Sequence, residues 1–409
     1  MRREIDSPYA WVRLAASVGL AALGGGGMWS VVVVLPAVQA DFGVDRAAAT
    51  LPYTLTTIGF GVGGMIMGRL ADKVGIIIPL VIGALALGLG NLLASQATTL
   101  WQFGIVYGVL IGLLGAGSTF APLMADISHW FEQRRGIAVA LCASGNYVAG
   151  ACWPPFIEFM VRAHGWRTAH LAAAAICVCG MLPLVLVLRA RSLQRRAGTA
   201  PPPMANRRVD LGPRALQLLL AVAGLACCVA MSMPQVHIVA YCGDLGYGAQ
   251  AGAFMLSLMT GFGIISRIGS GFLADRLGGL ATLVIGSAAQ GTALALYLMF
   301  SSLPSLYVVS ALFGLFQGGL VPSYAIIIRE NFPANQAGGR VGLVMMMTLL
   351  GMALGGWMSG VIFDATGSYR AAFANGVAWN IGNLVIALFL LSRARRVGAP
   401  VGRTEGQAA

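Results

Sequence analysis

The sequence predicts an all-α integral membrane protein with twelve transmembrane helices arranged as two six-helix halves. Composition gives the first indication, because 58% of the 409 residues are hydrophobic and only 10% are charged, whereas soluble proteins carry about 25% charged residues. Apolar runs of about 20 residues, enough to cross a bilayer, recur along the whole chain. The two halves also repeat short motifs at matching places. This composition excludes an ordinary soluble enzyme.

The apolar runs set the predicted helices. The first run, Trp11 to Pro36, is too long for the core of a signal peptide and is predicted to be the first span. The predicted spans lie near residues 11–36, 50–70, 76–96, 101–125, 136–161, 168–189, 215–241, 251–273, 280–300, 304–328, 340–363 and 370–392.

The formal charge of +12 is unevenly distributed across these spans. With the N-terminus inside, about 21 of the 26 basic residues fall on one side of the membrane, which is the positive-inside pattern. Both termini are therefore predicted to be cytoplasmic, and the charge gives no reason to expect nucleic acid as a partner. Arginine-rich, lysine-poor usage with short loops is typical of a prokaryotic inner (plasma) membrane protein.

One long polar stretch divides the chain. We expect an N-terminal half at 1–190, a cytoplasmic linker at 191–214, a C-terminal half at 215–395 and a cytoplasmic tail at 396–409. The basic linker residues fit a solvated loop better than a contact with lipid headgroups. The seven cysteines are scattered through the spans without histidines at metal-ligand spacing, so they indicate packing residues, with no metal or cofactor.

Four ordered pairs of motifs relate the halves. Gly68-Arg-Leu-Ala-Asp72-Lys-Val-Gly75 follows the second span, and Gly271-Phe-Leu-Ala-Asp275-Arg-Leu-Gly278 follows the eighth. The other pairs match Gly112 to Pro122 with Gly314 to Pro322, the segment from His129 to Gly136 with that from Asn331 to Arg340, and Gly165-Trp166-Arg167 with Gly367-Ser-Tyr369-Arg370. Such internal repeats are common in secondary transporters.

The glycine-bounded loop after spans two and eight resembles the signature of the major facilitator superfamily. The resemblance implies the fold of that family, with the glycines allowing a sharp turn and Asp72 facing a helix N-terminus or an arginine across a cytoplasmic gate. The expected gate residues are Arg69, Asp72, Asp126, Arg134 and Asp275.

A narrower resemblance begins at Trp130-Phe131 and continues through Arg134-Arg135-Gly136. Together with Pro154-Pro155 and Gly165-Trp166-Arg167, this stretch is similar to the group of monocarboxylate transporters and oxalate/formate antiporters. The resemblance runs through most of the chain, and its specific motifs cluster in the N-terminal half and in span eight.

Arg267 is the charge that lies deepest in a predicted span. At 1.5 Å per residue it is roughly 24 Å below the outer end of span eight and about 12 Å from Asp275. A charge in hydrocarbon costs at least about 3 kcal/mol and is usually functional. The carboxylates all map to loops or helix ends, so we expect no intramembrane acid beside Arg267 and predict that its guanidinium binds a ligand carboxylate.

The resemblance implies the same role, since monocarboxylate transporters hold the substrate carboxylate with an arginine at this place. Animal members also carry an aspartate four residues earlier and a lysine in span one. This chain has Gly263 at the first position and Lys73 as its only lysine, so that proton route is absent or rebuilt. Oxalate-type antiporters use a second basic residue in span eleven, which is missing here, and one deep charge favours a monoanion.

Further pocket candidates are polar or aromatic residues in spans expected to line the cavity. They fit a pocket or helix packing equally well. His237, near the outer end of span seven, is a candidate for proton coupling, although an interfacial role fits it too. The substrate-binding candidates are Arg267, Asn146, Tyr147, Trp29, Gln317 and Tyr324.

The sequence therefore predicts a secondary transporter that moves a small monocarboxylate such as lactate or pyruvate, together with a proton, by alternating access. Its predicted partners are a small organic anion, a proton and membrane lipid. An exchanger of oxalate and formate and an exporter of amphipathic compounds remain open as alternatives. The glycine-rich segments contain no P-loop, and no nucleophile-base pair indicates an enzyme.

Overall fold

The computed structural model describes residues 5–189 and 209–397, and most of the predicted 396–409 tail and most of the predicted 191–214 linker lie outside them. The N-terminal half comprises α1 (Pro8–Gly24), α2 (Gly26–Phe42), α3 (Arg46–Ala49), α4 (Leu51–Val74), α5 (Ile77–Ser95), α6 (Leu100–Val106), the π-helix η1 (Tyr107–Ala116), α7 (Ala121–Trp130), α8 (Arg135–His164) and α9 (Trp166–Arg189). The C-terminal half comprises α10 (Pro213–Asp244), α11 (Gly248–Leu277), α12 (Gly279–Met299), α13 (Leu303–Gln317), α14 (Leu320–Asn331), α15 (Ala334–Thr366) and α16 (Tyr369–Val397).

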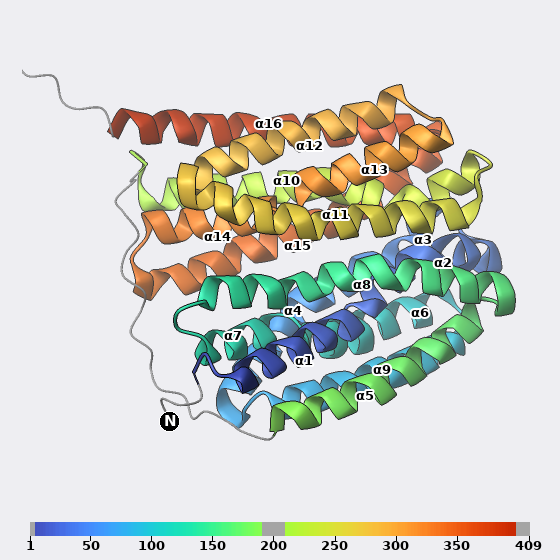
Figure 1. Ribbon diagram of the computed structural model, residues 1–409. Helices are drawn as coiled ribbons and strands as arrows, with labels where there is room; N and C mark the ends of the chain where they lie inside the picture. Colours follow the sequence, from blue (N-terminus) through green and yellow to red (C-terminus); the bar gives the residue numbers. More distant parts are fainter. Residues whose placement is uncertain (1–4, 190–208, 398–409) are drawn as a thin grey trace, which may run out of the picture.

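These elements make twelve passes along one bundle axis, because α1 with α2, α6 with η1 and α7, and α13 with α14 each form a single pass. Within the described residues, eleven helical stretches are long and apolar enough to cross a membrane. The one pass outside this set is α4, the second along the chain. It is 24 residues long, but its apolar residues are interspersed with threonines and glycines. The predicted twelve-helix membrane fold in two six-helix halves is confirmed (Figure 1).

The repeated loops adopt the same turn in both halves. Gly75 and Gly278 both have φ of 84°, a conformation that only glycine adopts without strain. Each donates its N–H to the carbonyl oxygen four residues earlier, Ala71 or Ala274. The sequence repeat is therefore a repeat of structure.

Glycines also set the distance between helices inside each half. A Cβ on Gly63 in α4 would lie 2.0 Å from the carbonyl oxygen of Leu113, and one on Gly314 in α13 would lie 2.2 Å from that of Met259 in α11. Side chains are excluded at both contacts, so the backbones approach as closely as they do at the small-residue interfaces of membrane helices.

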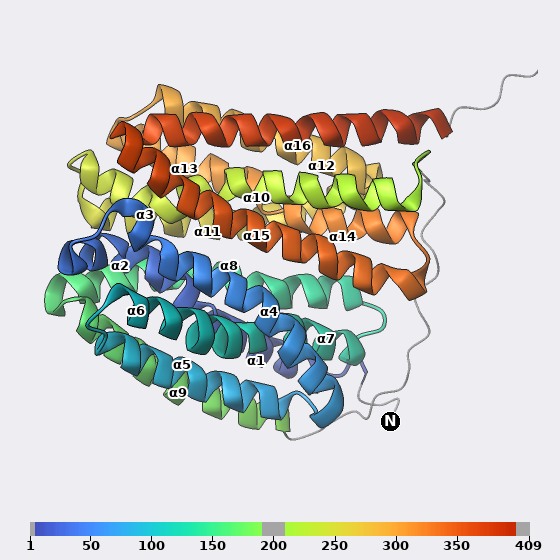
Figure 2. The ribbon, with the colours of Figure 1, turned by 180° about the vertical axis from the view of Figure 1, so that it is seen from behind.

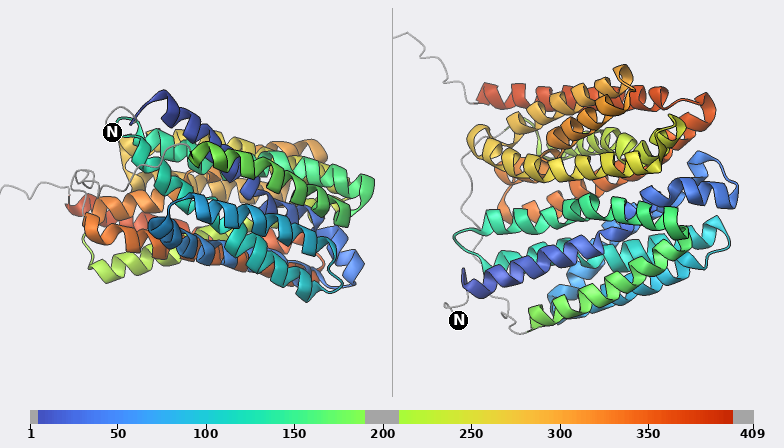
Figure 3. Two further views of the ribbon diagram at one scale, coloured as in Figure 1. Left: turned by 90° about the horizontal axis from the view of Figure 1, so that it is seen from below. Right: turned by 45° about the vertical axis from the view of Figure 1, so that its right-hand side comes forward.

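The two halves meet along a shared face. The contacting pairs are α2 with α10, α3 and α4 with α15, and α8 with α11. We call the end of the bundle where α1 begins and α16 ends the terminal end and the other, where α3 lies, the opposite end (Figure 1). Figure 3 shows the two halves as separate groups of helices in its second view.

The halves are in contact at the opposite end and diverge toward the terminal end. A Cβ on Gly360 would lie 2.8 Å from Cα of Ala47 in the other half, and one on Gly61 would lie 2.9 Å from Leu349. Among the described atoms, a Cβ on Gly68 or Gly342, farther along the same two helices, would meet no neighbouring element within 4 Å. Figure 2 shows α4 and α15 separating in that direction.

Candidate functional site

Arg267 lies on α11 where that helix faces α8 of the other half. It is ten residues before the last residue of α11, Leu277, or about 15 Å along the axis. Its Nη1 donates a 3.0 Å hydrogen bond to the carbonyl oxygen of Ala143, and its Nε lies 3.5 Å from that of Gly318. Its Cζ lies 4.5 Å from the ring centroid of Tyr147. We call these four residues the Arg267 site.

The described contacts of the Arg267 guanidinium are all with neutral groups. The ion pairs of the described residues join other side chains, and none brings a carboxylate within 4.0 Å of this guanidinium. The arginine is half-buried, so it keeps part of its surface for a ligand. Two carbonyl oxygens and an aromatic face orient the guanidinium without neutralising it, which leaves its charge available to an anion.

Tyr147 explains why glycine stands at position 263. A Cβ on Gly263 would lie 2.6 Å from Cε1 of Tyr147 and 2.8 Å from Cδ1. The tyrosine ring therefore occupies the space that an aspartate side chain would need there. At this place the neighbour of Arg267 is therefore an aromatic ring and not a carboxylate.

The pass formed by α13 and α14 is interrupted beside Arg267. α13 ends at Gln317, and α14 begins at Leu320 after Gly318 and Gly319. Gln317 is fully buried, and neither its Oε1 nor its Nε2 has a hydrogen-bond partner within the described structure. Interrupted helices are common at transporter binding sites, and a buried amide without partners costs about 1–3 kcal/mol.

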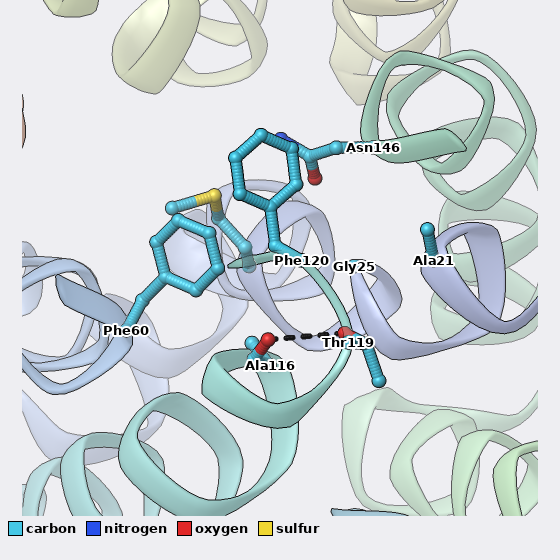
Figure 4. A pocket seen from close by; sticks show the side chains of 8 residues that line it. Ala21, Gly25, Phe60, Ala116, Thr119, Phe120 and Asn146 are labelled. Atoms are coloured by element: carbon cyan, nitrogen blue, oxygen red, sulfur yellow. Dashed lines mark hydrogen bonds between the residues drawn. The ribbon is translucent and has the colours of Figure 1, made fainter. Parts of the chain in front are cut away.

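Asn146 and Trp29 lie in the N-terminal half, next to Tyr147. The Trp29 indole Nε1 donates a 3.1 Å bond to the carbonyl oxygen of Asn146. The Asn146 side chain borders a pocket of about 10 Å³, room for one water molecule. Figure 4 shows the Asn146 side chain beside the ring of Phe120, whose centroid is 5.7 Å from that of Phe60. The lining residues are Ala21, Gly25, Met28, Phe60, Ala116, Thr119, Phe120 and Asn146.

Tyr324 is directed into the C-terminal half. Its hydroxyl donates a 2.8 Å bond to Oδ1 of Asn383 in α16, and the amide of Asn383 donates to Ser287 in α12. All of these groups are buried. The structure therefore gives Tyr324 a packing environment and does not bring it together with the Arg267 site.

Four of the five expected gate residues lie at the terminal end and are exposed. They are Arg69, Asp72, Arg134 and Asp275. The fifth, Asp126, forms a bidentate pair with Arg13 of α1, with bonds of 2.8 and 2.9 Å. In this conformation Asp126 is thus held inside the N-terminal half by Arg13, and its role in a cytoplasmic gate stays a prediction.

Sequence reasoning missed Arg13. The residue is 1% exposed, donates a 2.7 Å bond to the carbonyl oxygen of Leu188 and lies 4.6 Å over the ring of Trp130. It connects α1, α7 and α9 at the terminal end. Its position at the edge of the first apolar run was the available signal, because an arginine there needs a partner when the helix end is buried.

Sequence reasoning also missed a second buried arginine, Arg46, at the opposite end. Its guanidinium contacts both oxygens of Asp244, at 3.2 and 3.3 Å, and donates a 2.6 Å bond to the Tyr369 hydroxyl. Its Cζ lies 4.5 Å over the Phe363 ring. The backbone N–H groups of Arg46 and Ala47 donate to the carboxylate of Asp364.

We call the C-terminal-half residues around Arg46 the Arg46 cage: Asp244, Phe363, Asp364 and Tyr369. Arg46 comes from the N-terminal half and is 8% exposed, so the cage joins the two halves. His237 extends it, because Nδ1 is 2.9 Å from the Tyr369 hydroxyl and Nε2 is 2.8 Å from the carbonyl oxygen of Gly356. The structure places His237 in this network, away from the Arg267 site.

Twelve passes in two repeated halves, with a deep arginine at their interface, define a multi-pass membrane transporter. The sequence matches the Major Facilitator Superfamily over residues 18–305 and 271–408, and the chain belongs to that family. This assignment agrees with the sequence prediction that the protein is not an enzyme.

Curated relatives agree with the assignment, and a solved structure has the same fold. The chain is 29% identical to Monocarboxylate transporter 13 of Rattus norvegicus over 90% of its own length and 86% of the relative's. It is 26% identical to the MFS-type transporter pynF of Aspergillus niger, covering 74% and 69%. The crystal structure of a bacterial homologue of the human lysosomal transporter Spinster, inward-facing and unoccupied, has a TM-score of 0.70 at 13% identity and covers 95% and 97% of the two chains.

Proposed function

We propose that this protein is a secondary transporter that moves a small monocarboxylate, such as lactate or pyruvate, together with a proton. The observation that carries the proposal is Arg267, a half-buried arginine at the interface of the halves with no carboxylate within 4.0 Å in the described structure. A planar guanidinium binds a carboxylate through two parallel hydrogen bonds. The likeness to a monocarboxylate transporter supports the same substrate class.

The surroundings of Arg267 suggest how a monoanion is held. Tyr147 lies against one face of the guanidinium, so the carboxylate binds at its open edge. The amide of Gln317, which has neither donor nor acceptor used within the described structure, is proposed to bind the keto or hydroxyl oxygen. Asn146 and Trp29, on the facing half, are proposed to bound the site on the other side.

The arrangement of the halves supports the proposal that the protein works by alternating access. Because the halves are in contact at the opposite end and diverge at the terminal end, we propose that a substrate reaches the Arg267 site from the terminal end. We propose that this end is cytoplasmic, in keeping with the positive-inside distribution, and that the protein resides in the plasma membrane. The exposed charges Arg69, Asp72, Arg134 and Asp275 are proposed to close the cytoplasmic end when the halves rock.

Uptake into proteoliposomes tests this proposal. We expect radiolabelled lactate or pyruvate to accumulate with an inward proton gradient, and Arg267→Ala to lower kcat/KM on the order of a hundredfold, since losing a desolvated charged contact costs 2–5 kcal/mol. Arg267→Lys restores the charge without the bidentate geometry and recovers only part of the loss. Arg329→Ala, an exposed arginine on α14 outside the repeated loops, is the matched control and leaves uptake unchanged.

Two outcomes would contradict the proposal. Full uptake by a folded Arg267→Ala protein would remove the anchor. Transport of oxalate against formate, or export of amphipathic compounds without monocarboxylate uptake, would replace the substrate class.

A further inference from the structure

The Arg46 cage has chemistry that the binding of a carboxylate at Arg267 does not use. Its bonds join the halves at the opposite end, through the side chain and backbone of Arg46. Gly360 brings the backbone of α15 against Ala47 at the same place. For the opposite end to open, the arginine must leave the cage, because Asp244, Asp364 and Tyr369 all belong to the other half.

The hydrogen bonds of His237 define its protonation state. The carbonyl oxygen of Gly356 only accepts, so Nε2 of His237 carries a hydrogen. The Tyr369 oxygen already accepts from Arg46, and its own hydrogen has Nδ1 of His237 as an acceptor 2.9 Å away. A neutral imidazole with its hydrogen on Nε2 therefore satisfies the donors of both His237 and Tyr369.

A proton on Nδ1 disturbs this arrangement in two ways. The tyrosine hydrogen loses its acceptor, because Nδ1 becomes a donor. A second positive charge also arrives next to Arg46, separated from it by one shared oxygen. His237 is fully buried, so water does not screen that charge.

The other charged groups of the cage are already engaged. Asp244 holds Arg46 through both oxygens, and Asp364 accepts from the N–H groups of Arg46 and Ala47. Tyr241 contacts the ring of Tyr369 edge-on, with centroids 5.5 Å apart. These neighbours stabilise the cage with a neutral histidine and leave no carboxylate bonded to the imidazole.

We propose that the Arg46 cage is a proton-sensitive latch, in which protonation of His237 releases Arg46 and opens the opposite end of the transporter. The latch accounts for a buried histidine that is bonded to the Arg46 cage and is not part of the Arg267 site. It adds a pH-dependent step to the transport cycle, and it rests on the proposed function only in assuming that the two ends open alternately.

Spin labels across the opposite end test the latch without any substrate. The label sites are Ala163 on α8 and Gln250 on α11, both exposed and in different halves, each changed to cysteine in a variant that lacks the seven native cysteines. Distances are measured by pulsed electron paramagnetic resonance in lipid nanodiscs. Acidification from about pH 7.5 to about pH 5.5, the range in which histidine titrates, is expected to lower the ratio of closed to open protein about tenfold.

Three variants separate the parts of the proposal. His237→Gln, whose amide NH2 can donate and whose amide oxygen can accept, as the two nitrogens of the neutral imidazole do, stays closed at both pH values. Arg46→Gln is open at both. His170→Gln is the matched control, because His170 bonds a tyrosine hydroxyl and a backbone carbonyl in the same way, but entirely inside the N-terminal half. It keeps the pH response.

A parent protein that does not respond to pH, or a His237→Gln variant that responds like the parent, overturns the proton sensor. An Arg46→Gln variant that stays closed overturns the proposal that the Arg46 cage holds the opposite end closed. The same labels in Arg267→Ala are expected to keep the full pH response, so a failure of the monocarboxylate proposal and a failure of the latch give different results.

Discussion

The buried pair of Arg13 and Asp126 makes the most direct prediction about stability. Arg13→Met removes the guanidinium but keeps an apolar side chain of similar length. The change leaves the Asp126 carboxylate, 16% exposed, without its bidentate partner, and leaves the carbonyl oxygen of Leu188 without its donor. Breaking one partner of a buried ion pair costs about 3–5 kcal/mol, and the partial exposure of Asp126 favours the lower end, about 3 kcal/mol.

A double-mutant cycle measures this in equilibrium unfolding of the purified protein in mixed micelles with increasing SDS. Asp126→Leu alone is expected to cost a similar amount, because it leaves Arg13 charged and buried. The double variant Arg13→Met/Asp126→Leu removes both charges and should lose less than either single change. Arg134→Met, an exposed arginine at the same end, is the control and should stay within about 0.5 kcal/mol of the parent.

Additive losses in the double variant would refute the reasoning, since the two side chains would then act independently. A stable Arg13→Met protein would do the same. Normal stability with altered uptake in Asp126→Leu would return Asp126 to the cytoplasmic gate, as the sequence first suggested.

Three further changes test single contacts. Gly360→Leu places a side chain against Ala47, where even a Cβ would be 2.8 Å from Cα. It should increase the labelling rate of a cysteine at the opposite end at least severalfold, and an unchanged rate would show that the contact is loose. Gln317→Leu removes a buried amide without partners in the described structure. It should raise the free energy of unfolding by about 1–3 kcal/mol and also raise KM for pyruvate. A lower free energy of unfolding would contradict the conclusion that the amide has no partner. Tyr324→Phe should cost about 1 kcal/mol through its bond to Asn383 and leave KM unchanged, so a raised KM would return it to the substrate site.

The fold could be predicted because its signals are local. Apolar runs of membrane length and repeated glycine loops are written in contiguous sequence, and Gly75 and Gly278 adopt the same turn. The helix ends were less accurate. The predicted span 101–125 corresponds to α6, η1 and α7 from Leu100 to Trp130, because the last turns of α7 extend beyond the apolar run and include the polar residues Asp126, Ser128 and His129.

The isolation of Arg267 could be expected, because every acidic residue fell near a predicted helix end. The pairings of the other buried arginines could not. Arg13 and Asp126 are 113 residues apart, and Arg46 and Asp244 are 198 apart, so no spacing in the sequence connects them. The bond from Tyr324 to Asn383 could not be predicted for a related reason. The break at Gly318 and Gly319 resets the face that α14 presents, and hydrophobic periodicity does not show which neighbour a face meets.

The two ends of the protein are built from different kinds of contact, and this difference bears on the cycle. At the opposite end the halves are joined by a buried arginine, two carboxylates and a close backbone approach at Gly360. Opening that end gives up these bonds, and a transporter that alternates must regain comparable free energy elsewhere, because a state that is much less stable is rarely populated. In the proposed cytoplasmic gate, exposed charges of the repeated loops supply that free energy when the terminal end closes. Asp72 belongs to one half and Asp275 to the other. A proton on His237 then acts on the larger of the two barriers, because it weakens the buried contact and leaves the exposed charges unchanged.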